Sequence, residues 1–363
     1  MTDRPFHPSS PFEPTSLLHN PRVVFAPPPD RAGLVPWRIA FGVGAGEEIE
    51  VPCPTGSAPP PEDDRGAGTA IAADSVRRWS LPVREGSLEL GAGTRLLGVV
   101  NVTPDSFSDG GRYHRADAAV EHAIALVEEG CDALDVGGES TRPGADPVPA
   151  DEEMHRVLPV VEHLARAVPV PISIDTTKAG VARAALEAGA SIVNDISGGR
   201  LDPGMGPLLA ERGVPVVVGH LRGTPRTMQD HASYRDPVAE VLGELRLACA
   251  ELLKVGVDPR RIVVDPGLGF GKRPQDNLEI LRRLAEFRSL GRPVLVGPSR
   301  KSFLGAILGG REPSGRAWAT AAAVALSVSG GAAFVRVHDV GAMRDVVRTA
   351  EAIREGRIAP WAE

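Results

Sequence analysis

The feature that most constrains the fold is a regular alternation of short apolar runs and helical patterns, which begins near residue 96 and continues almost to residue 363. The apolar runs are rich in β-branched residues, as is typical of strands buried on both faces. They lie at residues 96–100, 133–136, 171–174, 191–193, 215–218, 261–264, 293–296 and 333–337. Helical patterns separate many of them, at residues 116–129, 151–167, 178–188, 236–255, 274–288 and 315–329, and another follows at 342–354. Eight strand–helix units in series predict an α/β fold of the (β/α)8 TIM barrel type, with a doubly wound sheet as the alternative.

The chain before the barrel changes composition twice. Residues 1–52 are rich in proline but include strand-like pieces at 23–26 and 37–43, so we expect an N-terminal extension that is either a small β appendage or partly disordered. Residues 53–75 combine Pro, Gly and acidic side chains, which bury too little apolar surface to offset ordering, and they predict a linker. The barrel domain then spans residues 76–363, with a hairpin at 79–94 that plugs the bottom of the barrel.

Charge and cysteine content exclude several classes of protein. The formal net charge of -7 argues against sequence-independent binding of nucleic acid, which needs a positive field. No stretch approaches the roughly 18 apolar residues of a membrane span, so we expect no membrane segment. Cys53, Cys131 and Cys249 are too scattered for a disulfide framework, which indicates a reducing compartment and a cytoplasmic protein.

Polar side chains follow almost every predicted strand. In a (β/α)8 barrel the carboxyl ends of the strands meet at one end, where active sites are built. The polar residues at these positions are Asn101, Glu139, Thr141, Arg142, Asp175, Asn194, Asp195, His220, Arg222, Asp265, Ser299, Arg300, Lys301, Arg336, His338 and Asp339. The opposite ends carry mostly Pro, Ala and Ser, so this asymmetry predicts a catalytic mouth.

The basic residues of this mouth indicate an anionic substrate. Arg142, Arg336, His338 and the region around Lys301 can donate hydrogen bonds to an anionic group. Guanidinium groups in particular match the oxygens of a phosphate. We therefore expect a phosphorylated substrate.

The acidic and amide residues indicate the rest of the substrate. Asp175, Asn194 and Asp265 offer acceptors to the N–H groups of a flat heterocycle. Lys301 can donate to a carbonyl of the same ring. This combination suits an aminopyrimidinone.

Some of these residues have ordinary structural alternatives. Asp175 is also placed to cap the helix that begins near Lys178, and Asp265 to open a turn before Pro266. His220 is expected to be a core histidine rather than a catalytic one. The segment DPGLGFGK does not meet the GxxxxGK[ST] spacing, which argues against binding of a nucleoside triphosphate.

Taken together and in order, the strand-end motifs resemble a known family over about residues 80–360. They are NVTPDSFSDGG at Asn101, GGESTRPGA at Gly137, IDTTKAGVA at Ile174, NDISG at Asn194, HLRGTPRTMQ at His220, DPGLGFGK at Asp265, GPSRKSFLG at Gly297 and RVHDV at Arg336. The sequence closely resembles dihydropteroate synthase, the folate-pathway enzyme that sulfonamides target. The resemblance implies a transferase that joins p-aminobenzoate to 6-hydroxymethyl-7,8-dihydropterin diphosphate and releases diphosphate with the help of Mg²⁺. It also implies a homodimer.

The resemblance assigns roles to individual positions. It implies pterin-binding residues Asp175, Asn194, Ile196, Asp265, Gly297 and Lys301. It implies diphosphate-binding residues Asn101, Arg142, Arg336 and His338, with Asn101 also a Mg²⁺ ligand. The p-aminobenzoate site would comprise Phe107, Thr141, Pro143, Gly269, Phe270, Ser299 and Lys301. Asp175, Asp265, Lys301 and Thr141 are the implied catalytic residues, none of which acts as a nucleophile.

One position departs from the family, and two alternatives remain open. Gly219 stands where members usually have a Met packed on the pterin face, so we expect a pterin pocket that is wider or binds more weakly. One alternative is a catalytically silent paralogue that still binds pterin. The other is a methyltransferase that carries a methyl group from methyltetrahydrofolate to a corrinoid, although such an enzyme would not need the NVTPDSF, SRK and RVHDV segments.

Overall fold

The computed structural model describes residues 78–84, 86–91, 93–103 and 112–358. The predicted extension at 1–52, the predicted linker at 53–75 and Phe107 lie outside the described residues. Within the described part, no helix is both long enough and apolar enough to cross a membrane.

The described residues form a parallel barrel, which confirms the predicted (β/α)8 fold. Its strands are β3 (Arg95–Asn101), β4 (Ala133–Gly137), β5 (Ile172–Asp175), β6 (Ile192–Asp195), β7 (Val216–Gly219), β8 (Ile262–Asp265), β9 (Leu295–Val296) and β10 (Phe334–Val337). They pair in the order β8, β7, β6, β5, β4, β3, β10, β9. An isolated parallel bridge between Val264 of β8 and Val294, the residue before β9, brings the two ends of the sheet together and nearly closes the barrel.

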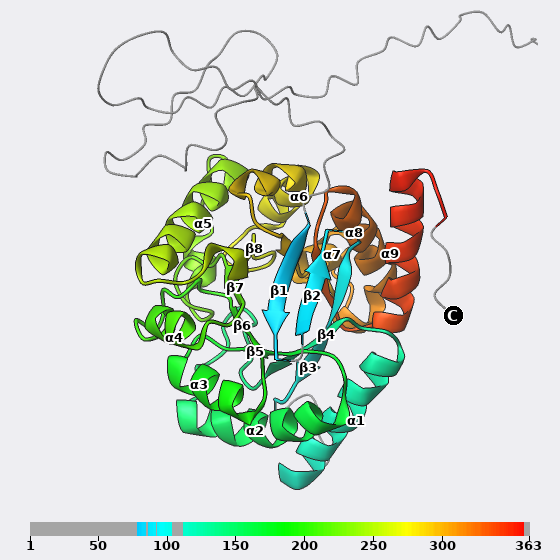
Figure 1. Ribbon diagram of the computed structural model, residues 1–363. Coiled ribbons are helices and arrows are strands. Elements are labelled where there is room, and N and C mark those ends of the chain that lie inside the picture. The colour runs from blue at the N-terminus through cyan, green and yellow to red at the C-terminus, as the bar shows by residue number, and fades with distance from the viewer. Residues whose placement is uncertain (1–77, 85, 92, 104–111, 359–363) are drawn as a thin grey trace, which may run out of the picture. The chain divides into compact units, whose positions relative to one another are not determined.

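Helices surround the barrel (Figure 1). They are α1 (Arg112–Glu128), α2 (Ala150–Ala167), α3 (Ala179–Ala188), α4 (Met205–Arg212), α5 (Pro237–Lys254), α6 (Pro274–Arg282), α7 (Ser302–Ile307), α8 (Ala317–Ser329) and α9 (Val340–Glu355). Short helices α4 and α7 were not predicted. The helix expected at 274–288 ends at Arg282 and gives way to a 3₁₀ segment at Leu284–Leu290.

The predicted hairpin is present and plugs the amino-terminal end of the barrel. Its strands β1 (Trp79–Val83) and β2 (Gly86–Leu90) pair antiparallel. Leu81 and Leu90 are each 1% exposed because they pack against the interior side chains at the starts of the barrel strands. Those side chains are Leu97, Ala133, Ile192, Val217, Val263, Leu295 and Phe334. In Figure 1 the hairpin lies across the barrel opening.

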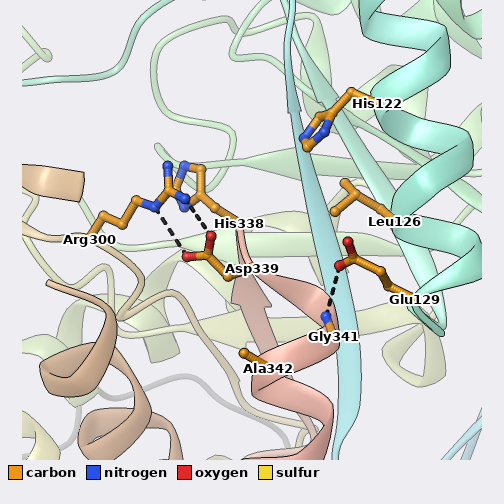
Figure 2. Close-up of a pocket in the computed structure, with 8 residues that line it drawn as sticks. All are labelled: His122, Leu126, Glu129, Arg300, His338, Asp339, Gly341 and Ala342. Atoms are coloured by element: carbon orange, nitrogen blue, oxygen red, sulfur yellow. Dashed lines mark hydrogen bonds and ion pairs between the residues drawn. The ribbon is translucent and has the colours of Figure 1, made fainter. Parts of the chain in front are cut away.

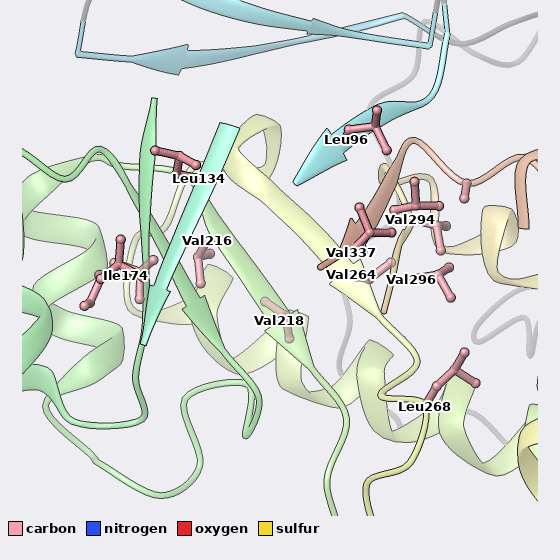
Figure 3. Packing of buried hydrophobic residues seen from close by; sticks show 14 of the residues in the cluster. Leu96, Leu134, Ile174, Val216, Val218, Val264, Leu268, Val294, Val296 and Val337 are labelled. Carbon is pink, nitrogen blue, oxygen red and sulfur yellow. The ribbon is translucent and has the colours of Figure 1, made fainter. Parts of the chain in front are cut away.

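The alternate strand positions point outward and form a second core beneath the helices (Figure 3). Val216 and Val218 of β7 belong to this outer core, whereas Val217 between them faces the inside of the barrel. Each strand is therefore buried on both faces, which is why the strands appear in the sequence as continuous apolar runs. The same alternation decides which side chains face the barrel interior at the carboxyl ends.

Candidate active site

Sheet register brings several predicted site residues to one level of the barrel. Asn101 of β3 pairs with Gly137 of β4, and Gly137 pairs with Asp175 of β5. Asp175 in turn pairs with Asn194 of β6. Asn101, Gly137 and Asp175 end their strands and Asn194 is the last residue but one of β6, so these four predicted strand-end positions lie side by side on adjacent strands.

Charged side chains fill the interior below this level. Arg336 Nε donates to Asp135 Oδ2 at 2.5 Å, and Arg336 Nη2 donates to Asp175 Oδ2 at 2.8 Å. Asn194 Nδ2 donates to the same Oδ2 of Asp135 at 2.9 Å. We call Asp135, Asp175, Asn194, Asp265, Lys301 and Arg336 the strand-end cluster.

Asp135 is a member of this cluster that sequence reasoning missed. It is 0% exposed and lies inside the apolar run at 133–136, where it was counted as part of a strand. Side chains alternate between the two faces of a strand, so a residue two positions before Gly137 lies on the same face of β4. That alternation could have identified Asp135 as an interior residue. Its Oδ1 atom is buried without a hydrogen-bond partner among the described residues.

Burial raises the pKa values of the two predicted catalytic carboxyl groups. The pKa of Asp175 rises to about 7, mainly because burial disfavours its charged form; Arg336 opposes the rise and Asp135 adds to it. Burial also raises the pKa of Asp265, against the hydrogen bond that its Oδ1 accepts from the Gly267 N–H at 2.7 Å. Perturbed pKa values of this kind are typical of functional sites.

Lys301 lies beside the aromatic ring of Phe270. Burial lowers the pKa of its ammonium to about 8, and Arg336 acts in the same direction. Lys301 Nζ is 3.9 Å from the centre of the Phe270 ring, a cation–π contact. A Cβ atom at Gly269 would lie 3.0 Å from Lys301 Cδ, so the glycine allows the loop to approach this side chain. Lys301, Phe270 and Gly269 therefore come together as predicted.

His338 and Ser299 form a second predicted pair. Ser299 Oγ lies 2.9 Å from His338 Nδ1. Burial lowers the pKa of His338 to about 3, and Arg336 and Arg300 add to this effect. The imidazole is therefore neutral near pH 7, and with Nδ1 facing Ser299 its Nε2 can carry a proton for donation.

His338 also lines an open pocket of about 490 Å³ at the edge of the mouth (Figure 2). In this view Arg300 and Asp339 face each other, and Arg300 Nη2 donates to Asp339 Oδ1 at 2.5 Å. Arg300 is the one described residue other than glycine with a positive φ, 57°. Since its charge is paired with Asp339, Arg300 serves to fix the segment before Lys301.

The predicted residues Thr141, Arg142 and Pro143 lie in the loop between β4 and α2. Arg142 and Pro143 are exposed and Thr141 is half-buried. The Gly144 N–H donates to the Pro225 carbonyl at 3.1 Å, which ties this loop to the loop after β7. Among the described residues, the hydrogen bonds of this loop do not run to the strand-end cluster, so the structure does not bring these three residues together with it.

A buried ion group holds the base of that loop. Lys178 Nζ contacts Glu139 of the loop and lies 2.5 Å from Glu153 Oε2 on α2. Glu153 is 0% exposed. The sequence places Glu139 after a strand but does not predict its pairing with Lys178, because these two residues lie 39 positions apart.

Of the structural alternatives considered for Asp175, Asp265 and His220, the first is wrong and the other two are confirmed. Asp175 does not cap α3: the Ala179 N–H donates instead to Asp202 Oδ2 at 2.7 Å, so that alternative is wrong. Asp265 does open a turn through Gly267 and also faces the cluster. His220 is a buried, hydrogen-bonded core histidine, as expected.

The backbone packs tightly beside Gly219. A Cβ atom at Gly219 would lie 2.5 Å from Cα and 2.8 Å from the carbonyl carbon of Ile196. The backbone after β6 therefore occupies the space that a side chain would need. Ile196 packs with Leu221 and Met228, and Phe270 lies against this group.

Asn101 provides a donor that fits a magnesium ion. Within the described ranges, no group of three or more His, Cys, Asp or Glu residues could hold a metal ion alone. Mg²⁺ commonly takes few protein oxygens, keeps several waters and is completed by substrate phosphates. The amide oxygen of half-buried Asn101, at the end of β3, suits this kind of shared binding.

Comparison with known proteins connects this geometry to a family. The family described as pterin binding enzyme matches residues 97–338. A dihydropteroate synthase of Synechocystis sp. is 44% identical over 277 residues, which are 75% of this chain and 94% of the relative. A dihydropteroate synthase of Mycobacterium leprae is 50% identical over 263 residues, which are 71% of this chain and 92% of the relative.

Solved structures agree with the sequence relatives. Dihydropteroate synthase of Xanthomonas albilineans with 4-aminobenzoic acid has a TM-score of 0.72 and 43% identity, over 77% of this chain and 99% of that chain. The same enzyme in complex with 7,8-dihydropteroate has a TM-score of 0.69 and 41% identity, over 76% and 98%. The Yersinia pestis enzyme with a sulfonamide drug complex has a TM-score of 0.72 and 37% identity, over 76% and 99%.

Proposed function

The chain belongs to the pterin-binding enzyme family and is one of its dihydropteroate synthases, and we propose that the strand-end cluster binds the pterin of its substrate. The reaction is a transfer in folate biosynthesis that yields 7,8-dihydropteroate. One observation carries the assignment of the site: carboxylates, an amide and an ammonium from different strands converge at the carboxyl ends of the barrel. The Xanthomonas albilineans relative binds 4-aminobenzoic acid and 7,8-dihydropteroate under the same fold.

The proposed pterin contacts follow from donor and acceptor chemistry. Asp175, Asn194 and Asp265 would accept from the amino group and ring N–H groups of the pterin, and Lys301 would donate to its carbonyl. Ile196 and Gly297 would line the same pocket.

The same cluster would stabilise the reacting pterin. Loss of diphosphate from the pterin methylene leaves positive charge on the ring, which nearby carboxylates stabilise. The amine of p-aminobenzoate then attacks that carbon. Asp175 and Asp265 need not become nucleophiles, because their charge is sufficient for this role.

Arg336 would also take part in holding the leaving diphosphate. We assign this role to Arg336, His338, Arg142 and Asn101. Arg336 already spans Asp135 and Asp175, so one guanidinium would connect the pterin and diphosphate sites. Asn101 would hold Mg²⁺ together with the diphosphate, and the ion would neutralise developing charge on the leaving group.

We assign the p-aminobenzoate site to the rim of the mouth. Phe270, Gly269 and Lys301 form one side of this site, with Ser299 beside His338. The remaining assigned residues are Phe107, Thr141 and Pro143. The relatives bind 4-aminobenzoic acid and a sulfonamide drug, so we propose that sulfonamides compete for this same site.

An apolar stripe on α8 supports a homodimer. The helix contains no charged residue, and Trp318 and Leu326 on it are 86% and 61% exposed. Ile353, on the contacting helix α9, is 78% exposed. Exposed apolar patches mark interaction surfaces. Sedimentation should give twice the chain mass, and Leu326→Arg should give the monomer.

We also propose that the enzyme works in the cytoplasm. Cys131 and Cys249 are both free thiols in the described structure and both are buried. Burial raises the pKa of Cys131 to about 12, which keeps it protonated and unreactive. Such thiols suit a reducing compartment.

Diphosphate release tests the proposed site. We expect release from hydroxymethyldihydropterin diphosphate with Mg²⁺ to depend on p-aminobenzoate in the wild type. Lys301→Ala and Asp265→Ala should each lower it by about 100-fold or more, since each removes a charge aimed at the reacting groups. Lys254→Ala, an exposed lysine of α5, is the matched control and should leave the rate unchanged. No release from a folded, pterin-binding wild type would instead identify a silent paralogue.

A further inference from the structure

A buried lysine outside the strand-end cluster ties together the loop between β8 and α6. Lys272 is 3% exposed, and its Nζ donates to the carbonyl oxygens of Gly267 and Phe270, each at 3.0 Å. The same Nζ lies 2.9 Å from His220 Nδ1. A buried ammonium is costly unless it is hydrogen-bonded, so these contacts define where the loop can lie.

His220 connects this lysine to a helix on the outside of the barrel. Its Nε2 lies 3.0 Å from Glu244 Oε2 on α5. Burial and the charge of Lys272 lower the pKa of His220 to about 3, so the ring is neutral. A neutral ring with Nδ1 accepting from Lys272 must donate from Nε2 to Glu244. The three side chains thus form one chain of hydrogen bonds, which we call the Lys272 relay.

The loop itself has little intrinsic preference for one shape. Gly267, Gly269 and Gly271 all have positive φ, at 69°, 82° and 56°. A Cβ atom at Gly267 would lie 2.1 Å from the carbonyl oxygen of His220, so the loop packs directly on the end of β7. Glycines of this kind leave the conformation to be fixed by side-chain contacts.

The loop delivers Phe270 to the active site. The Phe270 carbonyl accepts from Lys272, while its ring lies 3.9 Å from Lys301 Nζ. A shift of the Phe270 backbone would therefore move the ring and the cation that packs on it. Displacements of about 1 Å in such groups can change rates by about 100-fold.

We propose that the Lys272 relay positions Phe270 and Lys301 for the aromatic amine substrate, which makes Lys272, His220 and Glu244 positioning residues for the second substrate. The inference rests on the proposed assignment of Phe270 and Lys301 to the p-aminobenzoate site. None of the three relay residues needs to touch a substrate.

The charge of Lys272 depends on groups from several elements. Asp265 of β8 and Glu244 of α5 attract it, whereas Lys301 and Arg222 repel it. Burial is the largest effect, and it lowers the pKa of Lys272 to about 7. The ammonium form of Lys272 predominates below this pH. As the pH rises above it, the loop loses the hydrogen bonds that the charged ammonium donates. The KM for p-aminobenzoate should therefore rise on the alkaline side.

Steady-state kinetics of Lys272→Met test the relay. We expect the KM for p-aminobenzoate to rise by about tenfold, while the KM for the pterin diphosphate stays within about twofold. Lys254→Met is the matched control. A merely structural role would lower the active fraction, and so kcat, without changing either KM; that result would overturn the proposal.

Glu244→Gln provides a second test that does not remove the buried lysine. Without the Glu244 charge, the pKa of Lys272 falls further, so the rise in KM for p-aminobenzoate should move to lower pH. Lys301 also titrates near this range, but Glu244 is not among the groups that shift its pKa. An unmoved pH profile would overturn the relay.

Phe270→Ala separates failure of the relay from failure of the site. If Phe270→Ala raises the KM for p-aminobenzoate and Lys272→Met does not, the proposed site stands and the relay is wrong. If neither variant changes it, the assignment of Phe270 to p-aminobenzoate is wrong, and the relay falls with it.

Discussion

The two ends of the barrel are built from the same strands and the same alternation of side chains, yet they bury opposite kinds of residue. At the amino-terminal end, Leu81 and Leu90 of the hairpin pack on a cluster of apolar interior side chains. At the carboxyl end, the next interior positions carry Asp135, Asp175 and Arg336.

This difference separates stability from function within one fold. Apolar burial stabilises the folded state by roughly 25 cal/mol per Å². Burial of charge is unfavourable unless it is paired, and the raised pKa of Asp175 records that cost. The hairpin end therefore contributes stability, and the carboxyl end holds charged groups whose use lies in binding and chemistry.

Removal of the central cation should have the largest effect on stability. Arg336→Met would leave Asp135 and Asp175 buried without their partner, which should cost about 3–5 kcal/mol of unfolding free energy at pH 8. Denaturant unfolding measures this loss. At pH 5 the loss should be smaller, because Asp175 can then take up a proton.

Arg95→Met is the matched control at the other end. Arg95 Nη1 contacts Asp132 Oδ1 at 2.9 Å, but both side chains are partly exposed. Such a pair contributes about 0–1 kcal/mol. If Arg336→Met and Arg95→Met lowered the unfolding free energy equally, the two ends of the barrel would not differ in how they bury charge.

Shortening a buried side chain of the hairpin should lower the stability of the fold without changing the kinetics of the enzyme. Leu81→Ala should lower the unfolding free energy by about 2–5 kcal/mol, because it removes buried methyl groups and leaves a cavity. At a temperature where the variant is folded, kcat and both KM values should stay within about twofold of the wild type. Leu88→Ala, at a half-buried site of the same hairpin, should cost less. A selective change in KM would show that the two ends are coupled.

Gly219 tests the packing of the carboxyl end. Gly219→Ala forces a Cβ atom against the backbone of Ile196, 2.5 Å away, and should cost about 1–3 kcal/mol. Gly297→Ala is the control, since its Cβ atom would meet Arg336 Cβ at an ordinary 3.7 Å. Thermal unfolding of the two variants measures the difference. An unchanged Tm for Gly219→Ala would show that the Ile196 segment moves freely.

The barrel strands could be predicted from sequence because every one is buried on both faces. Such strands leave continuous apolar runs, and all eight predicted runs coincide with observed strands to within two residues. Helix α4 was missed because it has eight residues, includes Pro207 and has no side-chain cap. Helix α7 has six residues, too few to show a periodic pattern.

Site residues could be predicted from the sequence where they end or follow a strand, but not where they lie inside one. Asp175 and Asp265 end their strands and were found; Asp135 lies between Leu134 and Val136 and was not. Lys272 was hidden for another reason, since its partner His220 is 52 positions away. Contacts across the barrel leave no local pattern in a single sequence.

The pH dependence of stability gives the smallest and sharpest test of the two ends. Folding raises the pKa of Asp175 to about 7, so between about pH 4 and pH 7 the folded state holds this proton more tightly than the unfolded chain does. This contribution to stability is present at low pH and is lost as the pH rises towards 7. Relative to Asp175→Asn, the wild type should therefore lose on the order of 1–2 kcal/mol between pH 5 and pH 7.

Asp258, just before β8 at the amino-terminal end, has a pKa that is shifted in the opposite direction from that of Asp175. Hydrogen bonds from the Arg260 side chain and backbone lower the pKa of Asp258 to about 2. Its contribution is present above the unfolded pKa and is lost only as the pH falls towards 2. The difference between the wild type and Asp258→Asn should therefore stay constant between pH 5 and pH 7. If the wild type instead gained stability over Asp175→Asn in that range, charge at the carboxyl end would be stabilising, and the division between the two ends would be wrong.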